Sequence, residues 1–163
     1  MLVRNTFIAA LLSLAICPAM AADTSAPSEA AMAFVGQFSD DHLSGMLSRV
    51  GASQPAMMAA GQFNGSLLAV VFDAEIDKAV TEYGPEWQRA MASSWTGLMT
   101  DEQFTSLTND GADSPYSDTY LGLRSTAGAQ MQQNAGDLFR KILSQVVGNT
   151  FKELGAHVPT PSE

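Results

Sequence analysis

The sequence predicts an all-α protein, a single-domain helical bundle of about five to seven helices. Two observations carry this prediction. Between residues 131 and 154 apolar residues recur at three- and four-residue steps, which is the period of one broad helix face. Residues 66–72 resemble a buried strand, but no second strand-like run exists to pair with them, so we assign them to a helix.

The first 21 residues predict export and are set apart from the fold. Arg4 provides a positive start, residues 7–16 form a short apolar run, and Ala-Met-Ala at 19–21 fits a small-residue cleavage site. The apolar run is too short to span a bilayer. We therefore expect a signal peptide at 1–21, no stable membrane anchor, and a periplasmic or secreted protein.

The composition narrows the class of protein further. Cys17 is the only cysteine, and it lies in the predicted signal peptide, so the mature chain would fold without disulfides. The bulky Ile16 directly before Cys17 is a poor fit to a lipidation site. The chain of 163 residues holds 17 acidic and 8 basic residues, a net charge of −9, with no basic patch. Nucleic acid is therefore not an expected partner.

After the signal peptide we expect a flexible tether at 22–27, a helical domain at 28–155 and a C-terminal tail at 156–163. Ser28 is placed to cap the first helix, because its hydroxyl can accept from a free amide of the first turn. The second helix is expected to begin at Ser39 and to end at Gly51. Pro55, a favoured first helical residue, opens the third helix.

The middle of the chain carries a break signal and a cap signal. Gly84-Pro85 predicts the end of one helix and the start of the next, which carries Trp87 and Trp95. Thr100 followed three residues later by Gln103 is a capping box. The helix that it opens should be short, because Asn-Asp-Gly at 109–111 is turn chemistry.

The last part of the chain is expected to be a bent pair of helices. Pro115 restarts the helix after the turn, and Gly122 and Gly128 flank Ser125, where we expect a bend with Ser125 as the cap of the last helix. Gly128 would let another helix approach closely. Gly155 is expected to end the last helix.

Two stretches resemble an exported bacterial family labelled domain of unknown function 2059. Residues 99–104 (Met-Thr-Asp-Glu-Gln-Phe) are similar to its capped helix start, and residues 123–131 resemble its aromatic-x-Ser-Pro-x-Gly turn into an apolar last helix. Leu123 stands where the family prefers an aromatic residue and Thr126 where it prefers proline, and residues 109–117 resemble an insertion. The resemblance is confined to the C-terminal third. It implies a small, secreted, all-helical protein without assigned catalytic residues.

The residues that bear chemistry are sparse, and we assign none as catalytic, cofactor-binding or metal-ligating. His42, beside two acids at a helix start, is expected to be a surface residue, and the other histidine is His157. On a helix Asp73 and Asp77 share a face but Glu75 points elsewhere, so we do not expect these three acids to chelate a metal. The turn at 109–114 has oxygen ligands without the spacing or closing glutamate of a calcium loop. The scattered methionines are expected to fill the core rather than bind copper.

Two classes of function follow. The favoured one is a non-enzymatic binding or chaperone-like module of the bacterial envelope, with an apolar, acid-rimmed groove for another envelope protein or an apolar peptide or ligand. Trp87 and Trp95 are expected in the core or in the groove lining. The alternative is an enzyme with a dispersed active site near His42 and neighbouring acids. No cofactor is expected for either.

Overall fold

The computed structural model describes residues 26–157 and confirms the all-α prediction. Within these residues there are helices and turns and no strands. The predicted signal peptide, most of the tether and residues 158–163 of the tail lie outside the described residues. The elements are α1 (Glu29–Gly36), α2 (Ser39–Ala52), α3 (Pro55–Ser93), α4 (Asp101–Asp110), the 3₁₀ turn η1 (Gly111–Asp113) and α5 (Ser117–His157).

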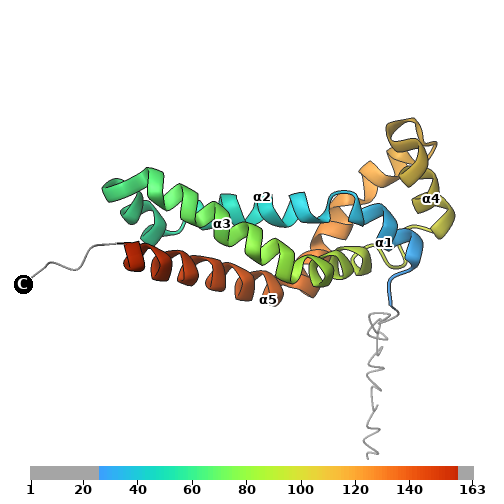
Figure 1. Cartoon of the computed structure of the whole chain (residues 1–163). Coiled ribbons are helices and arrows are strands. Elements are labelled where there is room, and N and C mark those ends of the chain that lie inside the picture. Colours follow the sequence, from blue (N-terminus) through green and yellow to red (C-terminus); the bar gives the residue numbers. More distant parts are fainter. Residues whose placement is uncertain (1–25, 158–163) are drawn as a thin grey trace, which may run out of the picture.

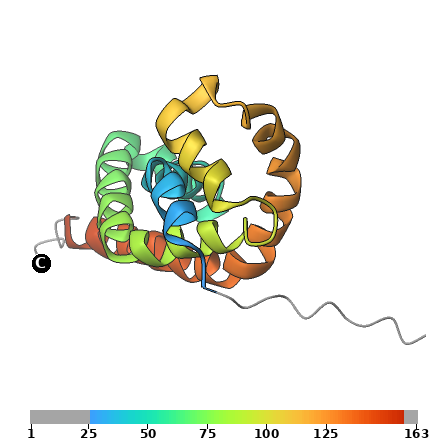
Figure 2. The ribbon, with the colours of Figure 1, turned by 90° about the vertical axis from the view of Figure 1, so that its right-hand side faces the viewer.

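The bundle is elongated and is built on its two long helices (Figure 1). α3 and α5 pack against each other over most of their lengths, and α2 lies against α3. α1 packs on α4 and α3 at one end, where the start of α5 also lies. Viewed from that end, α1 and α2 lie in the middle, with α3 at one side, α4 above, and α5 running below and up the other side (Figure 2).

Three helix starts predicted from local signals are confirmed, whereas α5 begins at Ser117, two residues after the predicted restart at Pro115. The Ser28 side chain accepts from the amide of Ala31 at 3.2 Å and caps α1. Pro55 is the first residue of α3. The Thr100 hydroxyl accepts from the Gln103 amide at 3.4 Å, and the Thr100 amide donates to the Gln103 side chain at 2.8 Å, which completes the capping box of α4. α4 then ends at the predicted turn.

The break expected at Gly84-Pro85 is wrong, because α3 continues through Pro85 to Ser93. Proline disfavours a helical residue before it partly through that residue's Cβ, which Gly84 lacks. Gly84 is also buried against α2, where an added Cβ would lie 3.0 Å from Asp40 Oδ1. Tertiary packing on α2 therefore holds the helix through a proline that costs it one backbone hydrogen bond.

The kink in α3 lies instead at Asn64, whose φ of −153° and ψ of 71° are not helical. The Asn64 side chain accepts from the amide of Leu67 at 3.3 Å, as a capping residue does. The segment after Asn64 is thus a newly capped helix that carries residues 66–72. The helical assignment of those residues is confirmed.

Four further expectations, on one cap residue and three glycines, are also wrong. α5 is one continuous helix, so Ser125 lies inside it and does not cap it; the direction change is a curvature of that helix (Figures 1 and 2). Gly128 is exposed, and an added Cβ would meet nothing within 4 Å, so no helix crosses closely there. α2 continues past Gly51 to Ala52, and α5 continues past Gly155 to His157. Neither glycine has the positive φ of a helix-ending residue, so each fits within its helix.

The core forms where α2, α3 and α5 meet. Leu43, Leu47 and Ile142 are fully buried, and Trp87 is 1% exposed. The apolar stripe between residues 131 and 154 faces this core, as the sequence predicts: its members are buried or packed against the buried cluster. Apolar packing between the helices therefore stabilises the fold.

Candidate functional site

Two adjoining hollows lie between α2, the C-terminal end of α3 and the first part of α5. Their volumes are about 330 and 460 Å³, within the range of small-molecule sites, and His42, Gly128 and Met131 line both. We call the two together the α2–α5 groove. Its apolar and aromatic lining is Phe38, Met46, Trp87, Met91, Trp95, Tyr120, Ala127, Met131, Ala135 and Phe139.

Small residues on α5 keep this groove open. Ala127 and Gly128 line the first hollow, and Ala135 and Gly136 line the second. An added Cβ at Gly128 would have no neighbour within 4 Å, so the position contributes space rather than a contact. Large lining side chains come from α2, from α3 and the turn after it, and from α5 itself, which contributes Tyr120 and Phe139. The groove therefore forms where small residues of α5 leave space between large ones.

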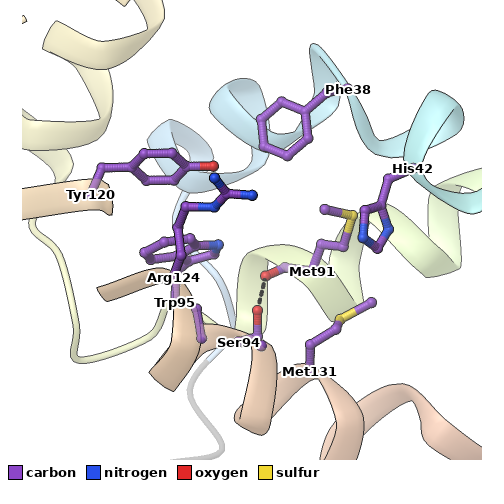
Figure 3. Close-up of a pocket in the computed structure, with 10 residues that line it drawn as sticks. Phe38, His42, Met91, Ser94, Trp95, Tyr120, Arg124 and Met131 are labelled. Atoms are coloured by element: carbon purple, nitrogen blue, oxygen red, sulfur yellow. Dashed lines mark hydrogen bonds between the residues drawn. The ribbon is translucent and has the colours of Figure 1, made fainter. Parts of the chain in front are cut away.

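Stacked rings form the walls of the groove. The His42 ring stacks on Trp87 with centroids 5.8 Å apart and an interplanar angle of 24°. Trp95 stacks on Tyr120 at 4.9 Å and 22°. Figure 3 shows Tyr120 and Arg124 reaching into the first hollow from one side, with His42 and Met131 on the other. Such preformed aromatic walls offer contact area without loss of conformational freedom on binding.

Trp87 lies between the core and the groove. It lines the second hollow and also contacts Phe139, with ring centroids 6.0 Å apart. Its Nε1 is buried and has no hydrogen-bond partner within the described residues. A buried donor without an acceptor costs about 1–3 kcal/mol, so the indole lies at the groove wall at a cost to folding stability.

The groove is rimmed by cations, which corrects the expectation of an acid rim. Arg124 lines the first hollow and Arg140 the second, and neither lining contains an aspartate or a glutamate. The reason is the helix register: Asp137 stands one turn before Arg140 and pairs with it rather than lining the hollow.

Two ionisable side chains in the groove have shifted pKa values. The pKa of His42 is lowered from its ordinary value of 6.5, first by burial of the ring and then by the charge of Arg49. The pKa of Tyr120 is raised by burial, which outweighs the opposing effect of Arg124. The imidazole is therefore neutral and the phenol protonated at neutral pH.

His42 is an exposed residue by its solvent-accessible area, as expected, although one face of its ring packs on Trp87. Within residues 26–157 no hydrogen bond joins its imidazole to a hydroxyl or a carboxylate. Ser94, which lines the same hollow, donates instead to the Met91 carbonyl at 2.6 Å (Figure 3). The side chain of His157 lies outside the described part of the molecule.

The structure also places the acids considered for metals. In α3, Glu75 is 4% exposed and pairs with Lys78, whereas Asp73 is exposed. At the 109–114 turn, Asp110 accepts from Ser106 at 3.0 Å and Ser114 is buried. Within the described residues no group of three or more histidine, cysteine, aspartate or glutamate side chains is arranged to hold a metal ion.

The methionines fall into three environments. Met57 and Met91 are buried in the core, as the sequence predicts. Met58 is 62% exposed. The remaining described methionines, Met32, Met46, Met99 and Met131, are partly buried against the core. Of these four, Met46 and Met131 line the groove.

The sequence predicts Trp87 and Trp95 in the core or the groove lining, and both line the groove, but it gives no indication of Arg124 and Arg140 there. Arginines on the polar face of a predicted helix are ordinary, and their position beside a hollow follows only from the curvature of α5. The one sequence feature that could have indicated Arg124 is its spacing from Gly128, because residues four apart lie on the same helix face.

Comparisons with known protein families, curated proteins and solved structures give no significant match. The resemblance to domain of unknown function 2059 therefore stays a prediction. Among residues 26–157, no helix is both long and apolar enough to span a bilayer.

Proposed function

We propose that the chain is an exported, non-enzymatic binding module of the bacterial envelope whose α2–α5 groove takes an apolar ligand. The observation that carries the proposal is the pair of adjoining hollows lined mainly by aromatic, methionine and small side chains. Concave, mostly apolar sites with a few placed polar groups are the usual form of a small-molecule site. The sequence-based expectation of export supplies the compartment.

Binding would be driven by removal of apolar surface from water, at roughly 25 cal/mol per Å² buried. Trp95 and Tyr120 supply rigid walls, and Met46, Met91 and Met131 supply adaptable ones, because methionine has three rotatable bonds and a polarisable sulfur. A site built this way discriminates by shape and apolarity more than by hydrogen bonds.

The test uses a neutral apolar fluorophore, N-phenyl-1-naphthylamine, whose emission rises when it leaves water. Gly128→Phe should place a ring in the groove and weaken probe binding about tenfold or more, by steric exclusion. Gly122→Phe is the matched control: Gly122 lies on the same helix, is exposed, has no neighbour within 4 Å and does not line the groove. Equal probe binding by both variants, or none by the wild type, would refute the proposal.

The alternative, an enzyme with a dispersed site near His42, has one observation in its favour. His42 lies where the two hollows join, and the lowered pKa keeps its imidazole available as a base at neutral pH. Hydrolysis of a short p-nitrophenyl ester that is lost in His42→Ala, with probe binding unchanged, would favour this alternative. The binding-module proposal expects no difference in ester hydrolysis between wild type and His42→Ala.

A further inference from the structure

The charges that line the α2–α5 groove are opposite in sign to those of the chain as a whole. The protein has 17 acidic and 8 basic residues, yet the charged residues that line the groove are Arg124 and Arg140. Arg49 adds a third cation close enough to His42 to lower its pKa. An apolar ligand that carries a negative group is therefore favoured over a neutral or cationic one.

The two rim arginines are not equivalent. Arg140 already pairs with Asp137. Arg124 forms no ion pair with a carboxylate in the part of the chain that the structure describes. Its guanidinium faces the same hollow as Tyr120, and its charge acts on the phenol. Arg124 is thus the cation with an unsatisfied capacity for an anion, and a guanidinium is suited to a carboxylate because both are planar and bidentate.

Away from Arg124, the groove becomes more apolar. Past His42 and Gly128 lies the second hollow of about 460 Å³, with Met46, Trp87 and Phe139 in its lining. A ligand held by its anionic end at Arg124 would extend its apolar part along α5 into this space. Arg140 also lines this second hollow, but its charge is already paired with Asp137. The order of groups along the groove is therefore an unpaired cation first and then thioether and aromatic surface, which matches a molecule with one charged head and one hydrocarbon tail.

We propose, on the basis of the binding function above, that the occupant of the α2–α5 groove is a free single-chain amphiphile with a carboxylate head. The head pairs with Arg124 beside the Tyr120 hydroxyl, and the tail lies over Gly128 and Met131 into the second hollow. The apolar surface supplies most of the affinity, and Arg124 selects the charge and fixes the orientation.

The experiment is displacement of N-phenyl-1-naphthylamine from the full mature chain by dodecanoate and by dodecan-1-ol, which have the same tail and differ in the head. Wild type should bind dodecanoate about three- to tenfold more tightly than the alcohol, the range for one partly exposed charge-assisted contact. Arg124→Gln should remove this preference while alcohol binding stays within about twofold. Arg124→Lys should restore part of it, because the charge returns without the fork.

The matched control is Arg89→Gln, which removes an exposed arginine of α3 that does not line the groove and should leave the preference intact. Equal displacement by acid and alcohol in wild type, or an equal effect of Arg124→Gln and Arg89→Gln, would overturn the carboxylate assignment and leave the apolar groove standing. Absence of probe binding in wild type would overturn the binding function itself.

Other occupants predict different outcomes of the same measurement. If the anion were a bilayer headgroup, the chain would bind phosphatidylglycerol vesicles and dodecanoate would not compete. If a second copy covered the groove, probe binding would fall as protein concentration rises and dodecanoate would again not compete. Either result overturns the proposal.

Discussion

A buried glycine near the end of α2 provides the sharpest test of the packing between α2 and α3. A Cβ added at Gly51 would lie 2.3 Å from Phe72 Cζ and 3.0 Å from its Cε2, whereas ordinary contacts are 3.4–4 Å. Phe72 is 6% exposed and borders a hollow of about 290 Å³ between α2 and α3, so its ring can yield only by leaving its present contacts and moving by roughly 1 Å towards that space. Overpacking of this kind costs about 1–3 kcal/mol, and the helix preference for alanine returns at most about 1 kcal/mol. Gly51→Ala should therefore lower the free energy of unfolding by about 1–2 kcal/mol.

The control for this prediction is the same substitution in the same helix. Gly45 has nothing within 4 Å of an added Cβ, so Gly45→Ala should raise the free energy of unfolding by about 0.5–1 kcal/mol through helix propensity alone. Urea unfolding followed by circular dichroism at 25 °C measures both changes. Opposite signs for the two variants are expected. A stabilised Gly51→Ala would show that Phe72 does not pack over α2 as the structure has it.

Two further predictions concern local features. Thr100→Ala removes the hydroxyl of the capping box and should lower the free energy of unfolding in urea by about 0.5–2 kcal/mol. The control is Thr105→Ala at an exposed position of the same helix, which should change stability by no more than about 0.5 kcal/mol. Equal effects of the two substitutions would contradict the cap. Because the folded pKa of His42 lies below 6.5, the unfolded chain binds its proton more readily, and stability should fall as pH drops from about 6.5 through the folded pKa. His42→Gln should lose less stability than wild type over that window, and parallel pH profiles would contradict the burial of the ring.

The accuracy of the sequence-based predictions follows the range of the interactions involved. The caps at Ser28 and Thr100 close hydrogen bonds to residues three positions away, so the local sequence contains both partners. The apolar stripe of α5 is equally local in its period. These features could be predicted because no distant segment has to be known for them to form.

The misplaced helix break shows where local rules lose to packing. Gly84-Pro85 has the chemistry of a break, and Asn64 has little to distinguish it from other polar residues in its segment. Yet the helix continues where Gly84 is buried against Asp40 of α2, and kinks at Asn64, which is exposed. A contact with a residue more than forty positions away decides the first case, and no window of the sequence around Pro85 contains that residue.

The tryptophans of the groove lining could be predicted for the same reason, whereas the charge of the groove could not. Apolar residues at Trp95 and Met131 follow from helical periodicity, whichever neighbour they face. The sign of the charges at the groove rim depends on which turn of α5 borders the hollow. That turn is set by the curvature of a continuous 41-residue helix. The electrostatic character of the groove is therefore a property of helix register, which is why a substitution at Arg124 tests the structure and not the composition.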